Sequence, residues 1–154
     1  MLLVFTVSRY KTSMSDDDPQ KFSEDFYQKK EDQRLSEAFL MWRKLHKAGV
    51  TNTTFLAVDF VHFGRSQESV ECLAKQLSEN YEIKIVPGNE SGYWFVQGTT
   101  RPYSITLDEY QHYNWVVFMV DTAKSHGCIF SSWALEAPSA GIKFYSEDIE
   151  RECK

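Results

Sequence analysis

The stretch SVECLAKQLSENYEIKIVPGNESGYWFVQGT, residues 69–99, changes from a helical to a strand pattern and then contains a turn. Its first part repeats apolar residues at the i, i+3, i+4, i+7 spacing of an amphipathic helix, at Val70, Leu73, Ala74 and Leu77. Residues 82–86 then alternate as a strand does, and turn-forming residues at 87–92 separate them from a second strand over 93–99. The stretch therefore predicts a helix followed by a β-hairpin.

The segments on either side extend this order. Residues 53–63 are rich in the β-branched and aromatic residues that strands favour. Acidic residues near the start of 107–125 favour a helix there, because negative charge stabilises a helix N-terminus, and a last strand follows over 128–136. Residues 53–137 thus predict the order β-α-β-β-α-β. This is the order of a ferredoxin-like α+β sandwich, in which four antiparallel strands carry two helices on one face.

An additional N-terminal helix is predicted before this domain. Residues 20–48 contain neither Gly nor Pro and carry apolar residues at helical spacing, until Gly49 ends the pattern. They form one long helix, or two with a break near 29–34. The predicted organisation is an extension that could be disordered (1–18), an N-terminal helical segment (19–50) and a ferredoxin-like domain (53–137). A charged tail follows (138–154), for which the sequence predicts no particular structure.

The composition indicates a globular protein with an acidic surface. The 17 basic and 22 acidic residues give a net charge of −5, which repels phosphate backbones and argues against direct nucleic-acid binding. Aromatic residues make up 15% of the chain, enough to supply both a core and an interface. Since no apolar stretch is long enough to span a bilayer, we expect a cytoplasmic protein.

No catalytic, metal or cofactor site is predicted. The four histidines lie far apart in the sequence, and the cysteines at Cys72, Cys128 and Cys153 show no metal-ligand spacing, which favours buried reduced thiols. An enzyme built on a Cys or a His remains the alternative from another functional class. Three pairings could supply acid–base groups but lack the surrounding motif of known hydrolases: Glu71 with Cys72, Asp59 with His62, and Asp121 with His126.

Asp59 lies inside the predicted strand over 53–63. A charge in a central strand has to face water or be paired, so Asp59 is predicted on the sheet face opposite the helices. Either this face is simply solvated, or it meets a partner, with Tyr93, Phe95 and Gln97 beside Asp59. An RNA-binding sheet, on which rings stack against bases, is a third alternative, although the basic-glycine-aromatic motif of such sheets is missing.

Six apolar residues in a row, over 115–120, mark the predicted helix 107–125. A helix buries one stripe, so such a run places some apolar residues on a second face. If Val116, Val117 and Val120 pack on the sheet, then Trp115, Phe118 and Met119 lie to the side. Two outcomes stay open for Trp115 and Phe118: cover by the N-terminal helix, through Leu35, Phe39 and Trp42, or a groove for a dimer or another protein.

The chain resembles the family of the regulator of ribonuclease E activity B. The resemblance covers about residues 35–137 and rests on the order of several short motifs: Lys47-Ala48-Gly49 before the first strand, Tyr81 at a helix end, Gly-Tyr-Trp-Phe-Val at 92–96, Pro102 and Thr106 before a helix, Ala123 to Gly127 at its end, and Trp133 in the last strand.

The resemblance implies a ferredoxin-like fold and a non-enzymatic role, in which the protein binds the endoribonuclease ribonuclease E and modulates RNA decay. The best-known members carry very acidic tails, whereas here Asp16, Asp17 and Asp18 form the one acid run. These three residues join Asp59, Tyr93, Phe95, Trp115 and Phe118 as candidate partner-binding positions. An immunity-type protein that neutralises a toxin is the alternative on the same fold.

Overall fold

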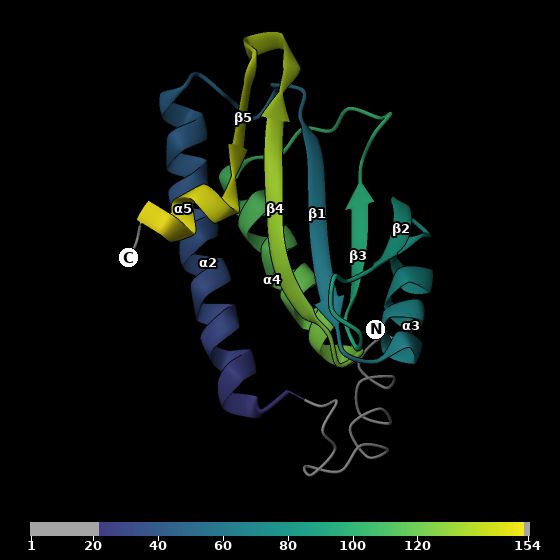
Figure 1. Cartoon of the computed structure of the whole chain (residues 1–154). Coiled ribbons are helices and arrows are strands. Elements are labelled where there is room, and N and C mark those ends of the chain that lie inside the picture. The colour runs from purple at the N-terminus through teal and green to yellow at the C-terminus, as the bar shows by residue number, and fades with distance from the viewer. Residues whose placement is uncertain (1–21, 153–154) are drawn as a thin grey trace.

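The computed structural model describes residues 22–152 and shows an α+β fold, with one five-stranded antiparallel sheet and four α-helices in that range. Figure 1 shows the sheet with α3 and α4 behind it and α2 along its β4–β5 side. The helices are α2 (Glu24–Lys47), α3 (Gln67–Leu77), α4 (Glu109–Ser125) and α5 (Ser146–Glu152). The strands are β1 (Ala57–Gly64), β2 (Glu82–Pro87), β3 (Trp94–Thr99), β4 (Ile129–Ala137) and β5 (Ile142–Tyr145), with a short 3-10 turn η1 (Pro138–Ala140) before β5.

The strand order across the sheet is β2-β3-β1-β4-β5, and each neighbouring pair is antiparallel. The predicted hairpin is confirmed, since β2 and β3 pair from Glu82 opposite Thr99 to Pro87 opposite Trp94. The prediction of four strands is wrong by one, because the tail is folded. Its residues 142–145 pair with β4 as β5, and α5 follows directly.

Alternation along β1 divides the sheet into two faces. Val58, Phe60 and His62 are buried towards the helices, whereas Asp59 and Val61 point the other way and are partly exposed. We call the side towards α3 and α4 the helix face. The other side, which no helix of residues 22–152 covers over β1, β2 and β3, is the open face (Figure 1).

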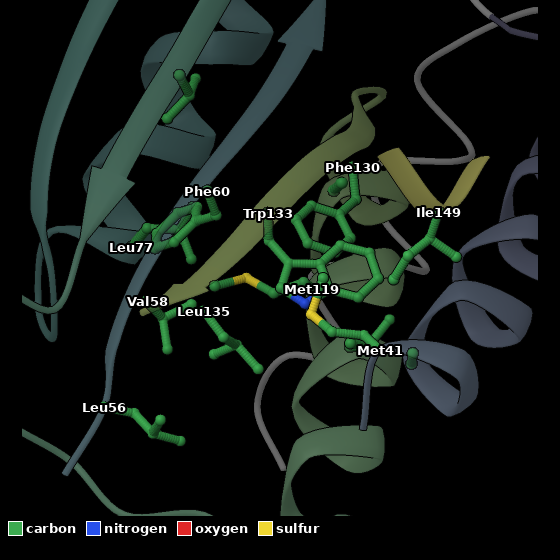
Figure 2. Close-up of a cluster of buried hydrophobic side chains, with 14 of the residues drawn as sticks. Met41, Leu56, Val58, Phe60, Leu77, Met119, Phe130, Trp133, Leu135 and Ile149 are labelled. Carbon is green, nitrogen blue, oxygen red and sulfur yellow. The ribbon is translucent and has the colours of Figure 1, made fainter. Parts of the chain in front are cut away.

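Aromatic, aliphatic and methionine side chains fill the helix face (Figure 2). The Phe60 ring meets the Tyr81 ring edge-on, with centroids 5.0 Å apart, and the Trp133 ring stacks on Phe130 at 5.3 Å. Gly98 lies opposite Phe60 in β3, and a Cβ atom there would come within 2.2 Å of the Phe60 ring. The chain therefore needs glycine at this point of β3 to let the central ring lie flat on the sheet.

Helix α2 is continuous, which confirms the first of the two alternatives, one long helix, and excludes a break near 29–34. The helix starts after Ser23, whose hydroxyl accepts a hydrogen bond from the backbone N–H of Phe26 at 3.1 Å, and α2 then packs along α4.

No helix between residues 22 and 152 has the length and apolarity that crossing a bilayer requires.

A buried ion pair explains why the sequence suggested a break. Arg34 and Glu37 point inwards and are 4% and 2% exposed, so polar residues interrupt the apolar stripe without interrupting the helix. One Arg34 nitrogen bonds both Glu37 oxygens at 2.8 and 2.9 Å, and Nε donates to the Phe130 carbonyl of β4 at 2.9 Å. Burial raises the pKa of Glu37, and Arg34 opposes that rise.

Removing one member of this pair should leave the other charge buried and uncompensated. We expect Glu37→Ala to lower the free energy of unfolding by about 3–5 kcal/mol in urea denaturation. The double variant Arg34→Met/Glu37→Leu should lose much less, because no charge stays behind. The exposed substitution Asp32→Ala is the control and should cost about 0.5 kcal/mol or less. Equal losses in the two Glu37 variants would contradict this account.

Candidate functional site

The open face contains a depression of about 470 Å³. Residues of all five strands line it, among them Lys84, Gln97, Asp59, Ser132, Lys143 and Tyr145, and Glu147 of α5 borders it. The pairing register of the strands decides which of these side chains lie next to one another. Gln97 lies opposite both Lys84 of β2 and Val61 of β1, and Val61 lies opposite Ser132 of β4. The face thus presents an apolar residue at its centre, with amide, hydroxyl and charged groups around it.

Asp59 is the centre of an ion-pair network at one end of the depression. Its carboxylate accepts hydrogen bonds from the Thr99 hydroxyl at 2.6 Å, from Nε of Arg101 at 3.2 Å and from Nζ of Lys143 at 3.0 Å. Arg101 also pairs with Glu136 of β4. Because these residues come from β1, β4, β5 and the end of β3, the network ties four segments together on one face.

The protonation of Asp59 follows from these contacts. Partial burial raises the pKa of the carboxyl, but the hydrogen bonds from Thr99, Arg101 and Lys143 outweigh burial, so the pKa lies below its ordinary value. The same contacts raise the pKa values of Arg101 and Lys143. The carboxylate is therefore ionised and saturated with donors near neutral pH, which suits a fixed charge better than a proton acceptor.

Aromatic residues mark the other end of the open face. The Phe63 ring lies 6.5 Å from Phe95 and 6.4 Å from Tyr93, centroid to centroid. Phe22 covers Phe63 edge-on at 5.6 Å, while Arg65 lies over the Phe22 ring at 4.4 Å. Asp59, Phe95 and Tyr93 thus sit on or beside one face, as the alternation of β1 predicted, at opposite ends of it.

The two candidates on α4 lie elsewhere. Trp115 packs in the core rather than to the side: its ring meets Phe60 and Phe130 edge-on, and its indole N–H donates to the Tyr81 hydroxyl at 3.0 Å. Met119 is fully buried. Phe118 is 39% exposed on the helix layer. The core-facing stripe of α4 therefore runs through the buried Val116 and Met119 and the partly buried Trp115, one step round the helix from the predicted stripe.

Helix α2 covers α4 only in part. Trp42 is buried and packs on the ring of His112 at 5.6 Å, and Leu35 is half-buried beside the core. Phe39 stays 50% exposed, with Arg43 over its ring. The acid run Asp16–Asp18 and Cys153 lie outside the described residues.

Sequence reasoning missed most of the charged residues around Asp59. Arg101 follows the predicted strand over 93–99 and Lys143 lies in the charged tail, and neither position has a periodic pattern that gives the direction of its side chain. One signal was present for Glu136, Ala134 and Ser132, because alternation in β4 puts all three on one face.

The histidines and the buried thiol do not converge. Asp59 and His62 lie on opposite faces of β1, and His62 is fully buried with neither ring nitrogen paired among residues 22–152. His126 bonds Gln76 at 2.7 Å. Burial raises the pKa of the Cys128 thiol to about 12, which disfavours a thiolate nucleophile. Cys72 is exposed, so the prediction of buried thiols is confirmed for Cys128 and wrong for Cys72.

His112 has a structural role. It is fully buried, and its Nε2 accepts the indole N–H of Trp133 at 3.1 Å, which joins α4 to β4. Burial lowers the pKa of His112 to about 4, so the ring is neutral when it accepts this bond. Across residues 22–152, no group of three His, Cys, Asp or Glu side chains is placed to hold a metal ion.

Comparison with known proteins adds no relative. No protein-family model matches the chain, and none of the curated proteins matches it.

The Asp59 network should stabilise the fold above the ordinary carboxyl pKa. A carboxyl with a lowered folded-state pKa contributes stability that is present above the unfolded pKa and is lost as pH falls through the folded value. We expect Asp59→Asn to cost about 1 kcal/mol at pH 7, discounted for the exposed part of the side chain. Urea denaturation should show the cost shrinking below about pH 4. A cost that is the same at pH 3 and pH 7 would contradict the role of the charge.

Buried His62 should make the protein sensitive to acid. Burial lowers the pKa of His62 from its ordinary value of 6.5 to about 3, so between these values the unfolded chain binds a proton that the folded chain does not bind. Stability therefore falls as the pH falls from 6.5 towards 3. In His62→Phe, we expect the slope of unfolding free energy against pH between 4 and 6 to fall by up to about 1.4 kcal/mol per pH unit. Equal slopes in the two proteins would show that the ring is protonated in the fold.

Proposed function

We propose that this protein is a non-enzymatic regulator that binds another protein through the open face of its sheet, and that its partner is the endoribonuclease ribonuclease E. The observation that carries the proposal is the open face itself. It combines a depression of about 470 Å³ with a network that fixes the charges of Asp59, Arg101 and Lys143 before any partner arrives. Pre-ordered side chains lower the entropy cost of association.

The fold supports the resemblance on which the choice of partner rests. We propose that β1, α3, β2, β3, α4 and β4 form a ferredoxin-like core. The strand order β2-β3-β1-β4, all antiparallel, supports this, as does the placement of α3 and α4 on the same face. In this proposal α2, β5 and α5 are additions that surround the core and leave the open face accessible, and the protein acts in the cytoplasm.

The character of the face also favours a protein over a nucleic acid. The network holds two acids and two cations in contact, so Arg101 and Lys143 are already neutralised by Asp59 and Glu136. Phosphate binding needs cations that can exchange counterions for phosphates. A mixed surface with an apolar centre, by contrast, is the usual composition of a protein interface.

Direct binding to purified ribonuclease E tests the proposal. We expect the wild-type protein to bind and to slow cleavage of a fluorogenic RNA. Gln97→Arg places a large charge at the centre of the open face, so it should weaken binding at least tenfold, about 1.4 kcal/mol. Asn114→Arg is the matched control, since Asn114 is also exposed but lies on α4, and it should change binding less than about twofold.

Two results would contradict the proposal. Absence of binding to ribonuclease E would remove the partner, and equal weakening by both variants would remove the open face as the site. If a basic toxin is instead bound and neutralised, with the same sensitivity to Gln97→Arg, the immunity-type alternative replaces the regulator on the same surface.

A further inference from the structure

Strand β2 forms one edge of the sheet. It pairs with β3 on one side, and no other strand within residues 22–152 pairs with its outer side. The strand is six residues long and mostly exposed, with Ile85 37% exposed on the helix face. Natural edge strands that avoid association usually carry charges whose repulsion or desolvation blocks a second strand. The charges on β2 therefore decide which second strand could pair with it.

The charges of β2 are self-complementary in one register. In an antiparallel pair, directly opposite residues share a face, and opposite charges attract while like charges repel. If two copies pair about Ile83, then Glu82 of each copy lies opposite Lys84 of the other, which gives two ion pairs. Sliding the pair to centre on Glu82 opposes two glutamates, and centring it on Lys84 opposes two lysines. Centring on Ile85 brings Pro87, which has no N–H to donate, opposite Ile83.

The same register matches the two faces of the sheet. Glu82 and Lys84 lie on the open face, because they pair with Thr99 and Gln97 of β3, whereas Ile83 and Ile85 lie on the helix face opposite Gly98 and Val96. In the pair centred on Ile83, the two Ile83 side chains meet, and the exposed Ile85 lies opposite Tyr81 of the second copy. Each side of the joined strands thus receives matching chemistry: ion pairs on one face and apolar contacts on the other.

We propose that β2 is a homodimerisation edge, where two copies of this chain pair antiparallel about Ile83 and join their sheets into one. The interface is isologous, as a twofold axis requires, because each contact occurs twice. The two open faces become continuous across the junction, since Glu82 and Lys84 line the depression in each copy.

Charge exchange within β2 provides the test, on the purified chain alone. Sedimentation equilibrium over a range of concentrations should give a wild-type dimer. Glu82→Lys opposes lysines and Lys84→Glu opposes glutamates, so each should weaken the dimer at least tenfold. The double variant Glu82→Lys/Lys84→Glu should restore it. An equimolar mixture of the two single variants should form a heterodimer, because every opposed pair then has opposite charges.

Two controls separate this edge from a general effect of charge. Glu90→Lys, in the exposed β2–β3 turn, and Lys75→Glu, on the exposed side of α3, should leave the wild-type dimer unchanged. Circular dichroism should show that all variants keep the fold. A wild-type chain that stays monomeric would overturn the proposal. So would single variants that dimerise like the wild type, or a double variant that stays monomeric. None of these measurements involves ribonuclease E, so the result is independent of the proposed function.

Discussion

The carboxylate of Asp59 is the point on which the open face depends. It lies in β1, the central strand, and receives donors from Thr99, from Arg101 just beyond β3, and from Lys143 in β5. Glu136 in β4 shares Arg101. A lone charge in the middle of a sheet would be poorly hydrated, but here each donor also gains an acceptor. The network thus converts a costly residue into a link between strands that are distant in the sequence.

Polar groups on the helix face are held differently from those on the open face. There the polar groups are few: His62 lies between the rings of Phe60 and Phe130, and Arg34 is buried against Glu37. His62 is held by packing, whereas Arg34 is held by hydrogen bonds to Glu37 and to the Phe130 carbonyl. One face of the sheet therefore packs into the core, and the other face presents polar side chains in fixed positions.

The sequence correctly predicts the features that follow from the periodic spacing of apolar residues. The hairpin of β2 and β3, the order of elements over 57–137 and the direction of Asp59 all follow from spacing that repeats over several residues. Spacing failed where tertiary contacts override it. Arg34 interrupts the apolar stripe of α2 yet is buried, because Glu37 and the Phe130 carbonyl receive it. The charged tail becomes β5 and α5, because β4 offers it an edge and the core accepts Ile149.

The contact between His112 and Trp133 makes two distant positions interdependent. The indole has a single N–H and the buried ring offers a single acceptor, and the two meet at 3.1 Å between α4 and β4. A phenylalanine at 133 would remove the need for an acceptor, and an aliphatic residue at 112 would leave the indole proton orphaned. In relatives of this chain, the residues at positions 112 and 133 should therefore covary, so that both are conserved or both are substituted.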